Sequence, residues 1–101
     1  MVYLITFDYR LVSIGPNQLR APKALVEHIK TLGSWARVTD RSWLLDTEIP
    51  YHELANDHVK PFLADKDFFL VVQLSAQDNY EGWLPQEVWK WLNQHLKGWA
   101  R

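Results

Sequence analysis

An apolar run at residues 2–7 ends at a carboxylate, Asp8, and this pattern restricts the fold most. The apolar side chains fall on both faces of such a strand, with Val2 and Leu4 on one face and Ile5 and Phe7 on the other. This is typical of a central strand in a sheet that is covered on both sides. In folds that mix helices and strands, the end of such a strand can hold a charge that meets a ligand. We therefore predict a strand over residues 1–9 and a candidate site at Asp8.

The remaining sequence predicts three helices and three further strands. Apolar residues recur at helical spacing after Pro22 and after Pro50, and a proline suits the first turn of a helix. Gly33 is a natural end for the first helix, and Pro61 should end or kink the second. The predicted strands are residues 35–39, 42–47 and 68–74, and a third helix opens at Pro85 and runs to about residue 97.

The order β-α-β-β-α-β is that of the ferredoxin-like split βαβ arrangement. We therefore expect an α+β fold of that type, with an extra C-terminal helix. The chain is short enough for one domain, made of a ferredoxin-like core over residues 1–76 and a Trp-rich helical extension over residues 77–101. In this arrangement two helices pack on one face of the sheet and the other face stays open.

We do not expect the open face to be exposed to solvent, because the first and last strands are apolar on both faces. Either the third helix or the sheet of a second subunit must cover it. Six tryptophans are also too many for one small core to hide, and large aromatic side chains concentrate at interfaces. We favour a symmetric sheet-to-sheet homodimer with Phe69, Val71 and Trp43 in the interface.

Composition restricts the classes of function. The chain has no cysteine, which excludes disulfides and thiolate chemistry. Its formal net charge of −1 argues against strong non-specific nucleic-acid binding, which depends on surplus Lys and Arg. An acidic phosphate ligand would meet the more basic half, residues 1–45. The first apolar run is too short for a membrane span or a signal peptide, so we expect a cytoplasmic protein.

Five short segments carry a further signal: residues 4–9 (LITFDY), 32–35 (LGSW), 40–45 (DRSWLL), 59–63 (VKPFL) and 67–74 (DFFLVVQL). In this order and spacing they resemble the small CRISPR-associated protein that bridges spacer-integrase dimers, the second in the numbered Cas series. They resemble more closely its stand-alone bacterial and phage relatives, which are labelled SinR family. The resemblance implies a ferredoxin-like homodimer stacked through its sheets. It also implies that Asp8 matches an aspartate that faces its symmetry mate and is associated with metal-dependent phosphodiester cleavage.

The chain departs from this family in two respects. The loop after the first strand keeps only Arg10 and Arg20 of a dense arginine cluster, and a Trp-rich helix stands in place of a swapped C-terminal strand. Both departures weaken an inference to integrase bridging. Other members of the family are non-catalytic scaffolds, so the resemblance leaves the enzyme question open.

Asp8 is the candidate catalytic and metal-binding residue, with Mg²⁺ or Mn²⁺ held between two copies of its carboxylate. The alternative is a strand-end aspartate that accepts backbone hydrogen bonds in the next turn. Arg10 and Arg20, together with Arg37 and Arg41 near the hairpin, are the candidate nucleic-acid-binding residues, because guanidinium groups clamp phosphate. The alternative for these arginines is solvation on loops.

Two functions stay open. The first is a metal-dependent endoribonuclease or DNase, with Asp8 paired across a homodimer. The second is a non-catalytic dimeric scaffold whose Trp-rich C-terminus binds a protein partner. Neither function involves a membrane.

Overall fold

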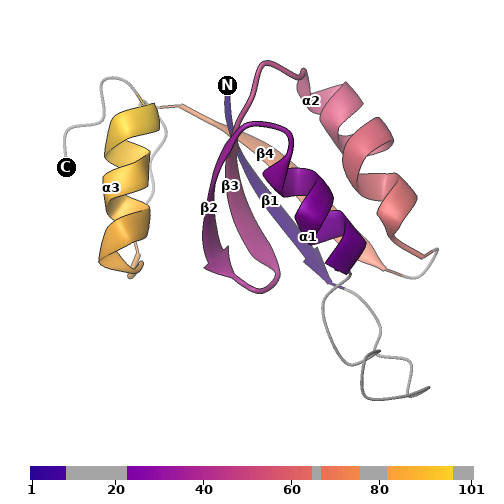
Figure 1. The fold of residues 1–101 in the computed structure, drawn as a ribbon, viewed down its shortest axis with the longest axis horizontal. Coiled ribbons are helices and arrows are strands. Elements are labelled where there is room, and N and C mark those ends of the chain that lie inside the picture. The colour runs from indigo at the N-terminus through magenta and orange to yellow at the C-terminus, as the bar shows by residue number, and fades with distance from the viewer. Residues whose placement is uncertain (9–22, 65–66, 76–81, 97–101) are drawn as a thin grey trace.

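The computed structural model describes residues 1–8, 23–64, 67–75 and 82–96. The strands are β1 (Val2–Asp8), β2 (Ser34–Thr39), β3 (Ser42–Asp46) and β4 (Phe68–Leu74), and the α-helices are α1 (Lys23–Lys30), α2 (Tyr51–Glu53) and α3 (Gln86–His95). Two helical segments, η2 (Leu54–Val59) and η3 (Lys60–Phe62), continue α2. Three layers result, with α1 and α2 on one face of the sheet and α3 on the other (Figure 1).

The four strands form one sheet in the order β2-β3-β1-β4, and every neighbouring pair is antiparallel. In this register Val2 of β1 lies between Asp46 of β3 and Leu74 of β4. The predicted order of elements is therefore confirmed. The chain is an α+β protein with a four-stranded antiparallel sheet and a C-terminal helix, compatible with a ferredoxin-like fold.

The second helix changes its geometry along its length. It begins after Pro50, whose carbonyl accepts the N–H of Leu54 at 2.9 Å. The turns of η2 then widen to π-helical spacing, and the N–H of Lys60 bonds to the carbonyl of Ala55. Pro61 lies in the 3₁₀ turn of η3, with which the helix ends. Proline has no N–H for a continuing α-helix, and the prediction that Pro61 ends or kinks this helix is confirmed, since the helix changes to a 3₁₀ turn there and ends at Phe62.

Alternate side chains of β1 form the core beneath α1 and η2. The buried residues of this core are Tyr3, Ile5, Phe7, Leu25, Ile29, Trp43, Leu45, Leu54 and Val59. The hydroxyl of Tyr3 donates a 2.8 Å hydrogen bond to the carbonyl of Ile49. This bond supplies the partner that a buried polar group requires.

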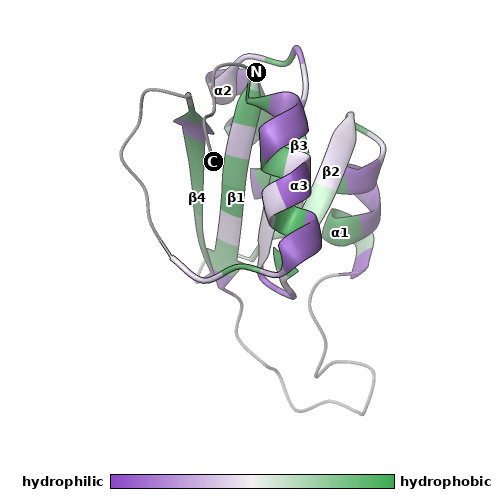
Figure 2. Cartoon of the chain, turned by 90° about the vertical axis from the view of Figure 1, so that its left-hand side faces the viewer, coloured by the Kyte–Doolittle hydropathy of each residue, from purple (hydrophilic) through white to green (hydrophobic). Residues whose placement is uncertain are grey.

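The opposite face of the sheet is covered in part by α3. The cluster buried there comprises Val2, Leu44, Val88, Leu92 and Leu96. Trp89 and Trp91 pack around this cluster, so two of the tryptophans stabilise the fold of this chain. The sequence left open whether the third helix or a second subunit covers this face. In the structure, α3 covers β2, β3 and part of β1 (Figure 2).

Beside α3, the same face of the sheet is uncovered along β4 from Phe68 to Val72, whereas Leu74 at the end of the strand packs against the α3 cluster. Three side chains lie in a row there and are exposed to 73% (Phe68), 57% (Leu70) and 37% (Val72). We call these three residues the exposed strip. Figure 2 shows β4 as a hydrophobic ribbon that lies beside α3 rather than beneath it. Apolar side chains of this size are seldom grouped in water without a partner.

The three residues predicted for a dimer interface lie on the other face of the sheet. Trp43 is buried beneath the helices, and Phe69 and Val71 pack against the same core. A sheet-to-sheet contact would therefore use the exposed strip, and the choice of face made from the sequence is corrected. Alternation separates the two faces of a strand, but the side on which the crossover helices pack decides which face is buried.

Candidate functional site

Asp8 lies at the end of β1, on the face that carries the exposed strip, and pairs with Phe68 in the register of the sheet. A hollow of about 210 Å³ adjoins it and is also lined by Thr6, Phe68 and Leu70. The Nη1 of Arg41 donates a hydrogen bond to Oδ1 of Asp8 at 2.9 Å. Both side chains reach into solvent, which weakens this ion pair.

The start of β3 places Arg41 next to Asp8. The carbonyl of Arg41 accepts the N–H of Phe7 at 3.0 Å. One residue further, the hydroxyls of Ser42 and Thr6 are hydrogen-bonded at 3.0 Å. These bonds hold the β2–β3 hairpin against the end of β1, so the two charged side chains meet. Residue spacing alone did not predict this pairing, because Asp8 and Arg41 lie 33 positions apart.

The donor set at Asp8 is small. Within the described residues, no three side chains among His, Cys, Asp and Glu gather in a way that could hold a metal ion. Mg²⁺ and Mn²⁺ prefer several oxygen ligands, and Asp8 offers one carboxylate that already accepts a bond from a guanidinium. One copy of the described chain therefore does not fit a divalent ion at Asp8. A second carboxylate would have to come from another copy.

The predicted basic residues divide into two groups. Arg10 and Arg20 lie outside the described residues. Arg37 forms an ion pair with Asp40, and Arg41 pairs with Asp8, so each of these guanidinium groups faces a carboxylate. The positive charge that this part of the chain offers to a phosphate backbone is correspondingly reduced.

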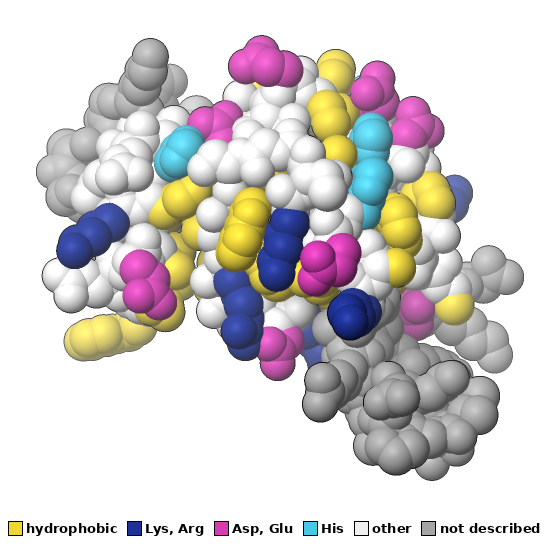
Figure 3. Space-filling model, in the orientation of Figure 1, with side chains coloured by type: hydrophobic (Ala, Val, Ile, Leu, Met, Phe, Trp, Pro, Cys, Tyr) yellow, Lys and Arg dark blue, Asp and Glu magenta, His cyan; other side chains and the backbone are white. Residues whose placement is uncertain are grey.

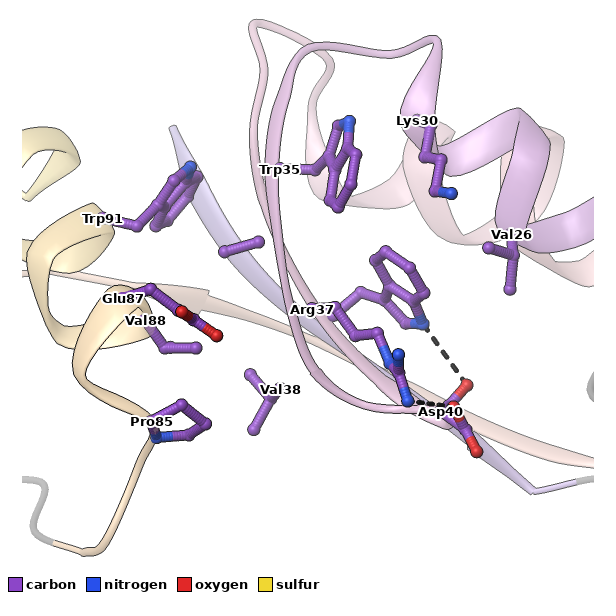
Figure 4. A pocket seen from close by; sticks show the side chains of 12 residues that line it. Val26, Lys30, Trp35, Arg37, Val38, Asp40, Pro85, Glu87, Val88 and Trp91 are labelled. Carbon is purple, nitrogen blue, oxygen red and sulfur yellow. Dashed lines mark hydrogen bonds and ion pairs between the residues drawn. The ribbon is translucent and has the colours of Figure 1, made fainter.

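A cavity of about 860 Å³ surrounds the edge strand β2 (Figure 4). On the side of α1 its walls include Lys30 and Trp35, and the Nζ of Lys30 lies 5.0 Å from the centre of the Trp35 ring. On the side of α3 its apolar walls are Val38, Val88 and Trp91. The cavity can therefore take an apolar group next to the edge of the sheet.

The Trp-rich segment has two kinds of surroundings. Trp83, which precedes α3, is fully exposed, whereas Trp89 and Trp91 pack on the sheet. Figure 3 shows a hydrophobic side chain that projects from the surface near the start of α3. Trp99 lies outside the described residues. Among the described tryptophans of this segment, Trp83 is thus the one placed for contact with another molecule.

One group of polar residues was missed by sequence reasoning. Ser34, Asp46 and His95 meet where the end of α3 reaches the sheet. Ser34 begins β2, Asp46 ends β3 and His95 is the last residue of α3. Ser34 and His95 are 61 positions apart, so no local spacing could have signalled this group.

Fold and site together define a small α+β protein with a helix-covered antiparallel sheet and a partly exposed apolar face. No family model matches the chain, and neither the curated proteins nor the solved structures include a match. In the described ranges, no helix is both long enough and apolar enough to cross a membrane.

Proposed function

We propose that this protein acts as a homodimeric interaction module whose two copies meet through their sheets. The observation that carries the proposal is the exposed strip, in which Phe68, Leu70 and Val72 stand in a row on the face that α3 leaves open. Burial of apolar surface is the main driving force of such an association. The resemblance to sheet-stacked dimers of the CRISPR-associated bridging family supports the same arrangement.

The charges around the exposed strip favour a second copy of this chain as the molecule that binds there. A two-fold axis brings the same patch of both copies together, so the patch must be complementary to itself. Asp8 and Arg41 lie at one end of the strip and carry opposite charges. In a two-fold contact, Arg41 of one copy can pair with Asp8 of the other, and no charge need be buried alone.

The oligomeric state of the full chain tests this proposal by sedimentation velocity over a range of concentrations. We expect a dimer for the wild type and a monomer for Leu70→Lys, because the new ammonium would have to be buried without a partner. Tyr51→Lys is the matched control, since Tyr51 is similarly exposed but lies on α2. A monomeric wild type would contradict the proposal, as would a Leu70→Lys variant that remains dimeric.

A metal-dependent phosphodiesterase is the second candidate, and the position of Asp8 favours it. Asp8 is exposed on the same face as the strip, so the proposed dimer would bring two Asp8 carboxylates to one interface. Such a pair could bind Mg²⁺ or Mn²⁺, which would stabilise the charge on a scissile phosphate. Nucleic acid would be held weakly, given the ion pairs of Arg37 and Arg41.

Cleavage of labelled RNA and DNA oligonucleotides, with and without Mn²⁺, separates the two candidates. A phosphodiesterase should lose metal-dependent cleavage in Asp8→Asn and keep it in Asp57→Asn, a control in η2 that leaves Asp8 intact. Cleavage that survives in Asp8→Asn would exclude the proposed site. If a dimeric wild type cleaves neither substrate, the interaction module alone is supported, and the exposed Trp83 becomes the first residue to test for a protein partner.

A further inference from the structure

Four side chains of β2, β3 and α3 are joined end to end by hydrogen bonds. The Oγ of Ser34 lies 3.1 Å from Nε1 of Trp91 and 3.2 Å from Nε2 of His95. The Nδ1 of His95 lies 2.7 Å from Oδ2 of Asp46. The imidazole also stacks on the indole of Trp91, with ring centres 4.1 Å apart, which restricts its orientation. A serine, a histidine and a carboxylate therefore stand in the order used in nucleophilic catalysis.

The chemistry of the four groups determines which group donates and which accepts in each of these hydrogen bonds. An indole N–H can only donate, so Ser34 Oγ accepts the bond from Trp91. The hydroxyl proton of Ser34 is then available to the lone pair on Nε2 of His95. An ionised Asp46 only accepts, which assigns the imidazole proton to Nδ1. This is the tautomer in which a histidine can remove a proton from a serine.

Asp46 is held in its ionised form. Burial by itself would raise the pKa of this carboxyl, but hydrogen bonds from His95 and from the ammonium group of Met1 outweigh burial and lower the pKa below its ordinary value. The carboxylate therefore orients the imidazole and would stabilise the imidazolium that forms when His95 takes up a proton.

The backbone holds the serine and the carboxylate side by side. Ser34 and Asp46 are partners in the β2–β3 register. Gly33, directly before Ser34, lies so close to the carbonyl of Asp46 that a Cβ would collide with it. The two residues therefore stand on paired strands, which position catalytic groups more accurately than loops do.

Ser34 is exposed and stands next to apolar space. Ala36 and Val38 follow it on the same face of β2, because side chains alternate along a strand. Both of them line the cavity at the strand edge together with Val88 and Trp91 (Figure 4). Trp91 thus contacts the serine and also forms a wall of the cavity. An apolar group attached to a carbonyl at Ser34 would lie against these side chains.

We infer that Ser34 is a nucleophile, with His95 as its general base, in the hydrolysis of small carboxylic esters that carry an apolar acyl group. Ser34 Oγ attacks the ester carbonyl, and its proton passes to Nε2 of His95. The bond to the alcohol then breaks, and the alcohol leaves with that proton. Water attacks the acyl-serine in the same way, with His95 as base, and the serine and a carboxylic acid are regenerated.

The same hydrogen bonds also fasten α3 to the sheet, so the test needs readouts that a structural contact would not change. The first is covalent labelling of the full chain with a fluorophosphonate, followed by intact mass and peptide mapping. We expect one label on Ser34 in the wild type and in Ser75→Ala, a control serine just after β4, and none in Ser34→Ala. Absence of a label on wild-type Ser34 overturns the inference.

The second readout is the rate at which the full chain hydrolyses p-nitrophenyl butyrate. His95→Asn should lower kcat/KM by about 100-fold or more, because a positioned general base contributes at least that much. His52→Asn, an exposed histidine of α2, should leave it unchanged. Equal rates in wild type and His95→Asn, with both chains folded by circular dichroism, would overturn the inference.

Discussion

Gly33 lies in direct contact with the backbone of Asp46, so close that any Cβ at residue 33 would overlap the carbonyl oxygen of Asp46. This approach brings the beginning of β2 against the end of β3, where Ser34 and Asp46 are paired in the register. The glycine was predicted from the sequence to end a helix. In the structure it also allows two strands to meet at the candidate nucleophile.

Gly33→Ala should lower the free energy of unfolding by more than about 1 kcal/mol, because the backbone of β2 or β3 must move to admit the methyl group. Urea titration followed by tryptophan fluorescence measures this change. Gly82→Ala is the matched control, since a Cβ there meets no atom within 4 Å. Equal stability of the two variants would show that the contact at Gly33 relaxes without cost.

In Asp46→Asn, the free energy of unfolding should depend less on pH in the acidic range than it does in the wild type. The pKa of this carboxyl is lower in the folded chain than its ordinary 3.8, despite burial, because of its bonds to His95 and to the ammonium of Met1. Its contribution is therefore present above pH 3.8 and is lost as pH falls through the folded pKa. Urea midpoints measured at a series of acidic pH values should fall less steeply in Asp46→Asn than in Asp57→Asn, and parallel curves would contradict this.

Tyr3→Phe should cost about 1 kcal/mol at neutral pH, because it removes the hydrogen bond to the carbonyl of Ile49. Burial raises the pKa of Tyr3 above 10.0 in the folded chain. The wild type should therefore lose stability as pH rises from 10.0 through the folded pKa, and Tyr3→Phe should not show this loss. Denaturant titrations at neutral and alkaline pH measure both effects, with Tyr51→Phe on the surface as control.

Asp8→Asn should change the free energy of unfolding by less than about 1 kcal/mol, because its ion pair with Arg41 is exposed to solvent. Thermal and urea unfolding of Asp8→Asn and Arg41→Gln measure this directly. A larger loss in either variant would show that the pair holds the hairpin to β1. A small loss makes Asp8→Asn a clean probe for the cleavage experiment, since the variant stays folded.

Much of the fold followed from local patterns. Three features depend only on neighbouring residues, and each was predicted. They are the apolar runs that form β1 and β4, the prolines before α2 and α3, and the end or kink of the second helix at Pro61. The candidate site was harder to predict. Asp8 was singled out by its position, but its partner Arg41 comes from a distant strand. Ser34, Asp46 and His95 come from three elements, and their spacing in the sequence does not indicate that they meet.

Residue order alone assigns the side chains of each strand to two faces, because alternation along a strand is a property of the local backbone. It therefore separated Phe69 and Val71 from Phe68, Leu70 and Val72. Which of these faces the helices bury, and which remains exposed, is a result of how the elements pack in the folded chain. That choice depends on the path of the crossovers and on where α3 docks, and these are properties of the assembled chain rather than of any segment.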